Sequence, residues 1–147
     1  MSAITAVELQ QRIHQAIPLS QAMGYQISEI ADTRITVVAP LGPNINIHGT
    51  GFAGSLYALG ILTAWGLCTY MISRAGLEAD LVVAEANIRY KAPVKNDIVC
   101  RCEAGPQSAR KFIDELAGKR RSRMMLEVLI GDGPAAVIQA EMHASRH

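Results

Sequence analysis

The sequence predicts a single α+β domain, residues 1–147, in which a curved antiparallel sheet of about six strands wraps around one long central helix. Three observations indicate this fold. Residues 49–73 form a run of twenty-five residues without a charge. Segments after the run alternate apolar and polar residues, as half-buried strands do. The chain has 147 residues, half of them hydrophobic, which is enough to bury one core.

Two helical segments and two strands are expected before the run. Thr5 and Glu8 have the spacing of a capping box, so the first helix begins near Ala6 and ends before Pro18. Gly24 is suited to ending a second, short helical turn. The short turn and the two strands are expected at residues 19–23, 25–30 and 34–39.

The uncharged run predicts the central helix over residues 52–75, with Gly76 following its end. About 20 apolar residues cross a bilayer, so length alone permits a membrane span. Three glycines dilute the hydrophobicity, however, and strongly basic flanks are missing. A helix that is apolar on all sides is then one surrounded by protein, and no membrane span is expected.

Four strands and one helix are expected after the run. The strands fall at residues 81–92, 98–103, 121–130 and 134–144, with a helix at 108–117 ended by Gly118 and a hairpin turn at 131–133. The buried face of the first of these strands is expected to carry Val82, Ala84, Ala86, Ile88 and Tyr90. In the second strand, Ile98, Cys100 and Cys102 are expected to point inward.

One helix cannot cover both faces of six strands, so the sheet is expected to curl around it. The edge strand and the far face then need a second subunit. This is the hotdog arrangement, and it predicts a homodimer, or a dimer of such dimers.

Composition narrows the classes of function. The formal net charge of +1 gives no overall attraction to nucleic acid or to a membrane surface. The cysteines, Cys68, Cys100 and Cys102, have no spacing typical of a zinc site, so no metal is expected and the thiols are taken as reduced. Reduced thiols and the lack of a signal-peptide pattern indicate a cytoplasmic protein.

A polar loop precedes the central helix, and it contains the candidate catalytic residues Asn46 and His48. In an extended segment Asn44 would share their face, while Ile45 and Ile47 would anchor the other. Together with the free N–H groups of the helix start, these donors would form an oxyanion site for a carbonyl oxygen. Further substrate contacts are expected from Gly49, Thr50, Gly54, Ser55 and Tyr57. The alternative is a loop whose Asn and His side chains only cap the helix and satisfy turns.

The chain resembles the YiiD C-terminal type of putative thioesterase, a hotdog-fold family, over nearly its whole length. The resemblance rests first on Pro43-Asn44-Ile45-Asn46-Ile47-His48-Gly49-Thr50 with the residues that follow to Tyr57. Shorter matching segments are Ile17-Pro18-Leu19, Met23-Gly24, Ala64-Trp65-Gly66 and Ala86-Asn87-Ile88-Arg89-Tyr90-Lys91-Ala92-Pro93-Val94. It implies an acyl-thioester substrate on coenzyme A (CoA) or acyl carrier protein (ACP), with CoA or phosphopantetheine as part of the substrate and no separate cofactor. Some members resemble malonyl-ACP decarboxylases, which would supply acetyl-ACP to fatty acid biosynthesis.

Conventional hotdog thioesterases carry an acid on the central helix, and this chain departs from that pattern. Tyr57 stands nine residues after His48, and no acid occurs from Gly51 to Ser73. Hydrolysis needs a base, for which His48 or Glu85 is available. Decarboxylation of a malonyl thioester needs only neutral donors and a water-poor cavity, so both reactions stay open. A binding module for acyl-CoA or acyl-ACP without catalysis is the third alternative.

Basic residues form a local cluster at 119–123, with Arg110 and Lys111 nearby. A charged, solvated surface is one interpretation. The other is a docking site for CoA phosphates or for an acidic carrier protein, formed by Arg89, Lys119, Arg121 and Arg123. Nucleic acid is not expected as a partner, because no aromatic residues are interleaved with the charges.

Overall fold

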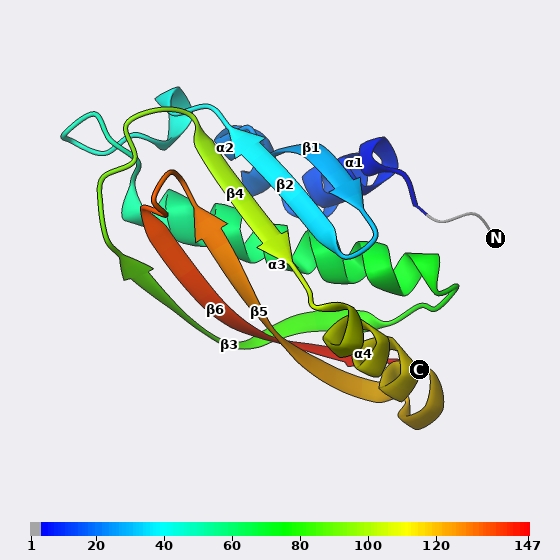
Figure 1. Ribbon diagram of the computed structural model, residues 1–147. Coiled ribbons are helices and arrows are strands. Elements are labelled where there is room, and N and C mark those ends of the chain that lie inside the picture. Colours follow the sequence, from blue (N-terminus) through cyan, green and yellow to red (C-terminus); the bar gives the residue numbers. More distant parts are fainter. Residues whose placement is uncertain (1–3) are drawn as a thin grey trace.

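The computed structural model describes residues 4–147 and has one curved antiparallel sheet with the helix α3 (Ala53–Arg74) along its concave face (Figure 1). The sheet has six strands in the order β1-β2-β4-β5-β6-β3, and every neighbouring pair is antiparallel. The strands are β1 (Gln26–Ala31), β2 (Arg34–Ala39), β3 (Asp80–Tyr90), β4 (Ile98–Glu103), β5 (Arg121–Ile130) and β6 (Ala136–Ser145). The predicted hotdog fold is confirmed.

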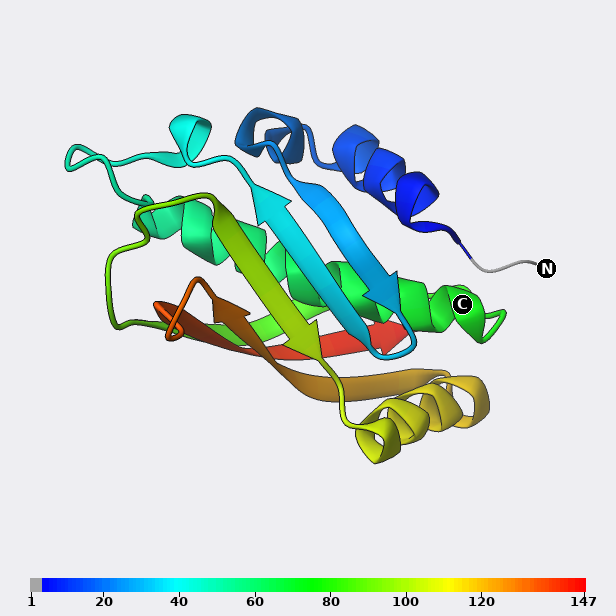
Figure 2. The ribbon, with the colours of Figure 1, turned by 45° about the horizontal axis from the view of Figure 1, so that its top comes forward.

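Two helices precede the sheet, α1 (Ala6–Ala16) and α2 (Leu19–Met23), and they lie beside β1 at one edge of the sheet (Figure 2). The predicted capping box is present, because the Thr5 hydroxyl accepts from the Glu8 N–H at 3.1 Å and the Glu8 carboxylate accepts from the Thr5 N–H at 3.2 Å. Gly24 ends α2 at φ 71°. The His14 side chain is partly buried, and its Nε2 lies 3.0 Å from the Tyr25 carbonyl oxygen.

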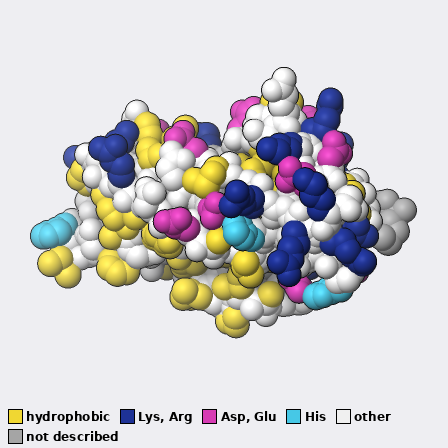
Figure 3. All heavy atoms as spheres, turned by 90° about the horizontal axis from the view of Figure 1, so that it is seen from below, with side chains coloured by type: hydrophobic (Ala, Val, Ile, Leu, Met, Phe, Trp, Pro, Cys, Tyr) yellow, Lys and Arg dark blue, Asp and Glu magenta, His cyan; other side chains and the backbone are white. Residues whose placement is uncertain are grey.

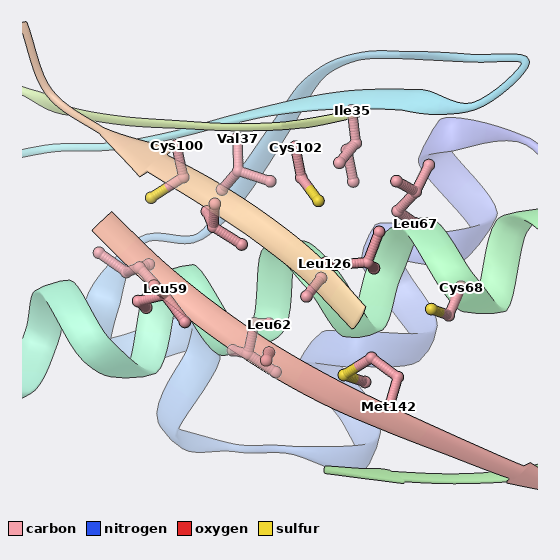
Figure 4. Packing of buried hydrophobic residues seen from close by; sticks show 14 of the residues in the cluster. Ile35, Val37, Leu59, Leu62, Leu67, Cys68, Cys100, Cys102, Leu126 and Met142 are labelled. Atoms are coloured by element: carbon pink, nitrogen blue, oxygen red, sulfur yellow. The ribbon is translucent and has the colours of Figure 1, made fainter. Parts of the chain in front are cut away.

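The core lies between α3 and the concave face of the sheet. Leu59, Leu62 and Leu67 of α3 point toward side chains of β2, β4, β5 and β6 (Figure 4). The helix is long and apolar enough to cross a membrane, but 67% of its most apolar stretch is buried inside the domain, so it is the core helix. The three cysteines are free and buried, and burial raises the pKa of Cys100 and of Cys102 to about 12.

Helix α3 lies close to the sheet at Gly60. A Cβ atom there would lie 2.3 Å from the Cδ1 of Ile138 and 3.1 Å from the Cδ1 of Ile130. Both isoleucines are fully buried. Glycine at this position therefore sets how near the helix lies to β5 and β6.

Strand β3 differs from the predicted alternation. Its pairing with β6 shifts between Val83 and Glu85, which is the signature of a bulge. Leu81 and Val83 therefore face the helix before the bulge, and Ala86 and Ile88 face it afterwards. The prediction that Val82 and Ala84 share the buried face is wrong, and Val82 is 59% exposed.

Several boundaries also differ from the prediction by one or two residues. Helix α4 spans Pro106–Lys119, longer than the expected 108–117, because Pro106 occupies a first-turn position where its missing N–H is harmless. Gly118 lies inside the helix, and Arg120 ends it at φ 64°. Strand β6 begins at Ala136 rather than at 134. The inward positions of Ile98, Cys100 and Cys102 and the bounds of β5 are as predicted.

Candidate functional site

The polar loop forms a tight hairpin that projects from the end of the molecule where α3 begins (Figure 1). A short 3-10 turn, η1 (Gly42–Asn44), leads into it, and Ile45 then forms a bridge with Gly51. The Asn46 N–H donates to the Thr50 carbonyl at 2.8 Å. Gly49 has a φ of 74°, which an L side chain rarely adopts, so glycine is required to close this turn.

Asn46 holds the hairpin together through its side chain. Its Oδ1 accepts from the N–H groups of His48, at 2.9 Å, and Thr50, at 3.1 Å. Its Nδ2 donates to the Thr50 hydroxyl at 3.0 Å and has a longer contact of 3.4 Å with the Gly51 carbonyl. The side chain therefore positions the loop, and one Nδ2 hydrogen has only this long contact.

Asn44 has a different place from the one expected. It is buried, and its Nδ2 donates at 2.8 Å to the carbonyl oxygens of both Met23 and Pro40. Its own carbonyl accepts from the Phe52 N–H at 2.7 Å. Asn44 thus ties the loop to α2 and to the start of α3, because η1 interrupts the extended geometry that would have aligned it with Asn46.

The two isoleucines do not anchor the loop. Ile45 is 51% exposed and Ile47 is 95% exposed, so the prediction that they pack inward is wrong. His48 is also exposed, at the tip of the hairpin. The hairpin therefore exposes the apolar side chain of Ile47 and the imidazole of His48 at this end of the molecule.

The N-terminus of α3 is open. No side chain caps it, so the N–H groups of its first turn, from Ala53 to Ser55, have no partner within the helix. Gly54 lies directly under the ring of Phe52, where a Cβ atom would meet a ring carbon at 2.7 Å. The Tyr90 hydroxyl donates to the Ala53 carbonyl at 2.8 Å and fixes this end of the helix to β3.

Tyr57 is half-buried one turn into the helix. Desolvation, and to a smaller extent the nearby Tyr57, raises the pKa of Tyr90. The start of α3 and the end of β3 therefore form one apolar neighbourhood with two phenol groups, beside the open N–H groups.

Glu85 does not join this neighbourhood. It stands opposite Glu141 of β6 in the register of the sheet, and its exposed side chain shares the outer face with it. Helix α3 covers the other face. Within one chain, the Glu85 side chain therefore points away from α3, at whose start the hairpin that carries His48 lies.

The predicted docking residues lie at two separate places on the sheet. Lys and Arg side chains gather at one end of the face shown in Figure 3. Arg121 and Arg123 line a groove of about 550 Å³ with the buried Ser122 hydroxyl, which has no hydrogen-bond partner among residues 4–147. Lys119 ends α4 beside them. Arg89 lies at the far end of the sheet, opposite Val137, whereas Arg121 is opposite Ser145. Eight residues of β6 separate those two rows, or about 26 Å.

Sequence reasoning missed a cleft at the other end of α3. It has a volume of about 490 Å³ and lies between α3 and the start of β3, with Trp65, Thr69 and Leu81 in its wall. The Trp65 Nε1–H donates to the Leu81 carbonyl at 3.2 Å. Trp65 belongs to the uncharged run that predicts the central helix, and nothing in that pattern indicates that one of its side chains borders a cleft.

Comparison with known proteins places the chain in a family. Residues 6–141 match the model of the family described as "Putative thioesterase (yiiD_Cterm)". A crystal structure of a protein "with unknown function" from Chlorobaculum tepidum TLS superposes with a TM-score of 0.91 at 27% identity, covering 97% of this chain and 94% of that one. The "putative thioesterase" of Shewanella oneidensis superposes with a TM-score of 0.82 at 29% identity, covering 97% of both chains.

A third structure, a "probable thioesterase" of Pseudomonas aeruginosa, has a TM-score of 0.82 at 18% identity, covering 99% of this chain and 98% of that chain. At that identity the likeness concerns the fold. All of these matches span whole chains, so the similarity is of complete domains.

Proposed function

The chain belongs to the putative thioesterase family that residues 6–141 match, and from this premise we propose that it hydrolyses acyl thioesters of coenzyme A or acyl carrier protein at the start of α3. One observation carries the proposal: the uncapped first turn of a buried helix offers fixed N–H donors beside a hairpin that presents His48. Donors that are fixed in advance stabilise the oxyanion that forms on a thioester carbonyl.

The reaction follows from these groups. The His48 imidazole removes a proton from a water molecule as the water oxygen attacks the thioester carbon. The carbonyl oxygen becomes an oxyanion that the N–H groups of Gly54 and Ser55 stabilise, each such donor typically contributing about 3–4 kcal/mol. The carbon–sulfur bond then breaks, and the leaving thiolate takes the proton from the imidazolium. The products are a free acid and a free thiol.

Asn46 acts in this scheme as a positioning residue. Its Oδ1 holds the N–H groups of both His48 and Thr50, so it fixes the place of the imidazole relative to the helix start. The alternative role, donation from Nδ2 to the oxyanion, predicts a different response to substitution. Asn46→Asp keeps an acceptor for the loop N–H groups but removes the Nδ2 donor.

Release of thiol from short acyl-CoA substrates tests the proposal. We expect His48→Gln to lower kcat by about 100-fold or more, since general-base catalysis typically contributes 10²–10⁴. Asn46→Ala should lower it through loss of loop order, and Asn46→Asp should retain much more activity than Asn46→Ala. The exposed Asn96→Ala is the matched control and should leave the rate unchanged. A His48→Gln enzyme that hydrolyses at the normal rate would refute the role of the imidazole.

Decarboxylation of a malonyl thioester is the second candidate reaction. It is favoured because the hairpin and the central helix carry no acidic side chain that would repel the malonyl carboxylate. The chain contains no acid from Pro43 to Ser73, and Glu85 faces the outer side of the sheet. The carbon–carbon bond to the carboxylate breaks, carbon dioxide leaves, and the electron pair forms an enolate whose oxygen the same N–H groups stabilise. Proton uptake by the carbon yields the acetyl thioester.

Malonyl-ACP separates the candidates, because the two reactions give different products. Hydrolysis releases free ACP, whereas decarboxylation leaves acetyl-ACP, and mass spectrometry of the carrier distinguishes them. Decarboxylation requires no base, so His48→Gln should spare it while removing hydrolysis. Tight binding of acyl-CoA and acyl-ACP without either product would replace both reactions with a role in binding alone.

A further inference from the structure

The ring of Phe52 lies against the backbone of Gly54 at the start of α3. A Cβ atom at position 54 would lie 2.7, 3.2 and 3.4 Å from three carbon atoms of this ring. Real Cβ atoms essentially never come within 3.0 Å of a neighbouring atom, so the ring uses space that any larger residue at 54 would need. Glycine at position 54 therefore allows the ring to lie where it does.

Hydrogen bonds fix the backbone on both sides of the ring. The Phe52 N–H donates to the Asn44 carbonyl at 2.7 Å, and the Phe52 carbonyl accepts from the Leu56 N–H at 3.0 Å. The Tyr90 hydroxyl donates to the Ala53 carbonyl at 2.8 Å and ties the first turn to β3. The direction in which the Phe52 side chain leaves the backbone is therefore set, and the first turn cannot easily move away from the ring.

The ring lies on the side of the first turn where the free N–H groups are. In an α-helix the N–H groups point toward the N-terminus, and each Cα–Cβ bond tilts toward the same end. Because the ring lies against the position of the missing Gly54 Cβ, it stands beside the N–H groups of Gly54 and Ser55. Phe52 is 52% exposed, so the rest of the ring borders open space. The ring is therefore an apolar wall beside the donors of the proposed oxyanion site.

This wall is close to the second carbon of an acyl group whose carbonyl oxygen accepts from these donors. An oxygen accepts from an N–H at about 2.9 Å, and the carbon next to the carbonyl carbon, carbon 2, lies about 2.4 Å from that oxygen. Carbon 2 is then within about 5 Å of the Gly54 and Ser55 nitrogens. A methyl branch on carbon 2 would need space in the region that the ring occupies.

We infer that the Phe52 ring, held in place by its contact with Gly54, selects acyl groups that are unbranched at carbon 2. This selection rests on the proposed hydrolysis and names its class of acyl group. A straight chain can leave the helix start alongside the ring, whereas a branch must displace the ring or draw the carbonyl oxygen away from its donors. An apolar pocket typically discriminates about 10–200-fold for one methylene group.

Two isomeric thioesters test the selection. Butanoyl-CoA and 2-methylpropanoyl-CoA contain the same atoms and differ in the branch at carbon 2. Each ratio of kcat/KM is divided by the ratio for hydroxide-catalysed hydrolysis, which removes the intrinsic difference in reactivity. We expect the wild type to prefer the straight isomer at least about tenfold, and Phe52→Ala to reduce the preference to within about threefold. Phe52→Tyr keeps the ring and should keep the preference.

Gly54→Ala tests the dependence of the ring on glycine. The substitution keeps the N–H donor but displaces the ring, so the preference should fall as it does in Phe52→Ala. Introduced into Phe52→Ala, the same substitution should change the ratio by less than about twofold, since no ring remains to be displaced. Gly118→Ala has no atom within 4 Å of its new Cβ and is the matched glycine control. Met125→Ala, at a position 58% exposed on β5, is the control for losing an exposed apolar side chain.

A structural role alone would not change the ratio. General loosening of the helix start would lower kcat/KM for both isomers by the same factor, whereas removal of a wall favours the branched isomer specifically. Because the Phe52 side chain is half exposed, Phe52→Ala should remain folded, which its circular dichroism spectrum checks. Equal ratios for the wild type and for Phe52→Ala would overturn the selection by the ring.

Thioethers extend the test to binding without turnover. S-butyl-CoA and S-(2-methylpropyl)-CoA carry the same branch at the corresponding carbon and have no thioester bond to hydrolyse. In isothermal titration calorimetry we expect the wild type to bind the straight thioether about tenfold more tightly. Phe52→Ala should bind the two with nearly equal dissociation constants.

The outcomes separate this selection from the proposed hydrolysis. Turnover with an unchanged isomer ratio in Phe52→Ala would overturn the selection and leave hydrolysis in place. Thioethers discriminated through Phe52, with no acyl-CoA turned over by the wild type, would do the reverse. A Gly54→Ala enzyme with the wild-type ratio would overturn the dependence of the ring on glycine. Neither turnover nor binding would overturn both proposals.

Discussion

The close approach of α3 to the sheet at Gly60 gives a stability prediction that can be worked from the structure. In Gly60→Ala the new Cβ would lie 2.3 Å from the Ile138 Cδ1, where carbon atoms normally remain about 3.5–4.0 Å apart. Ile138 and Ile130 are both fully buried, so neither can swing aside into solvent. The helix must shift away from β6, or Ile138 must leave its rotamer.

The magnitude follows from two opposing contributions. Overpacking of a core typically costs about 1–3 kcal/mol. Replacing glycine by alanine inside a helix contributes about 1 kcal/mol in the other direction. We therefore expect Gly60→Ala to lower the free energy of unfolding by about 0–2 kcal/mol. Gly118→Ala in α4 has no atom within 4 Å of its new Cβ, so this control should raise the free energy of unfolding by about 0.5–1 kcal/mol.

A double-mutant cycle in urea, at one protein concentration, measures the contact itself. Ile138→Val removes the Cδ1 atom that clashes and alone costs about 0.5–1.5 kcal/mol. Combined with Gly60→Ala it should cost about 1 kcal/mol less than the sum of the single changes, because the same atom is responsible for the clash. Additivity to within about 0.3 kcal/mol would refute the assigned contact, and so would a Gly60→Ala protein as stable as Gly118→Ala.

Four further predictions concern individual side chains. Asn44→Ala should lower the free energy of unfolding by about 2–4 kcal/mol in urea, since it removes the donor from the Met23 carbonyl in a buried hydrogen bond and from the Pro40 carbonyl in a part-buried one. A loss under about 1 kcal/mol would show that water replaces the amide. In the folded protein at pH 8, Cys68, Cys100 and Cys102 should not react with a thiol reagent, because burial raises their pKa values, and rapid labelling would contradict this. The thiols ionise at lower pH in the unfolded chain than in the folded one. The free energy of unfolding should therefore keep its full thiol contribution below about pH 9 and lose it as the pH rises toward 12. Thr5→Ala should remove about 1 kcal/mol through loss of the α1 cap, and an unchanged urea midpoint would refute it.

The sequence predicted the elements whose signals are local. The capping box places the start of α1, the uncharged run places α3, and strict alternation gives the bounds of β5, Arg121–Ile130. Each of these depends on residues within one or two turns of each other, where side-chain periodicity and backbone geometry are directly coupled. The need to wrap six strands around one apolar helix then determined the hotdog architecture.

The candidate site was predicted in part. The sequence identified the polar loop and the free N–H groups at the start of α3, since these follow from residue type and position. It expected an extended segment, whereas the loop closes into a hairpin at Gly49. It placed Asn44 beside Asn46, but the 3-10 turn buries Asn44 against carbonyl oxygens at Met23 and Pro40. Those acceptors are up to twenty-one residues away in the chain, so no local pattern indicates them.

Tertiary structure alone decided which residues face the same space. The bulge in β3 depends on how β3 pairs with β6, more than fifty residues later, and it turns Val82 outward and Glu85 away from α3. Strand order likewise puts Arg89 and Arg121 at opposite ends of one sheet. Local sequence determines the alternation of apolar and polar side chains along a strand. Which face of the sheet those side chains occupy depends on the strand's partner, because register is set by contacts between distant residues.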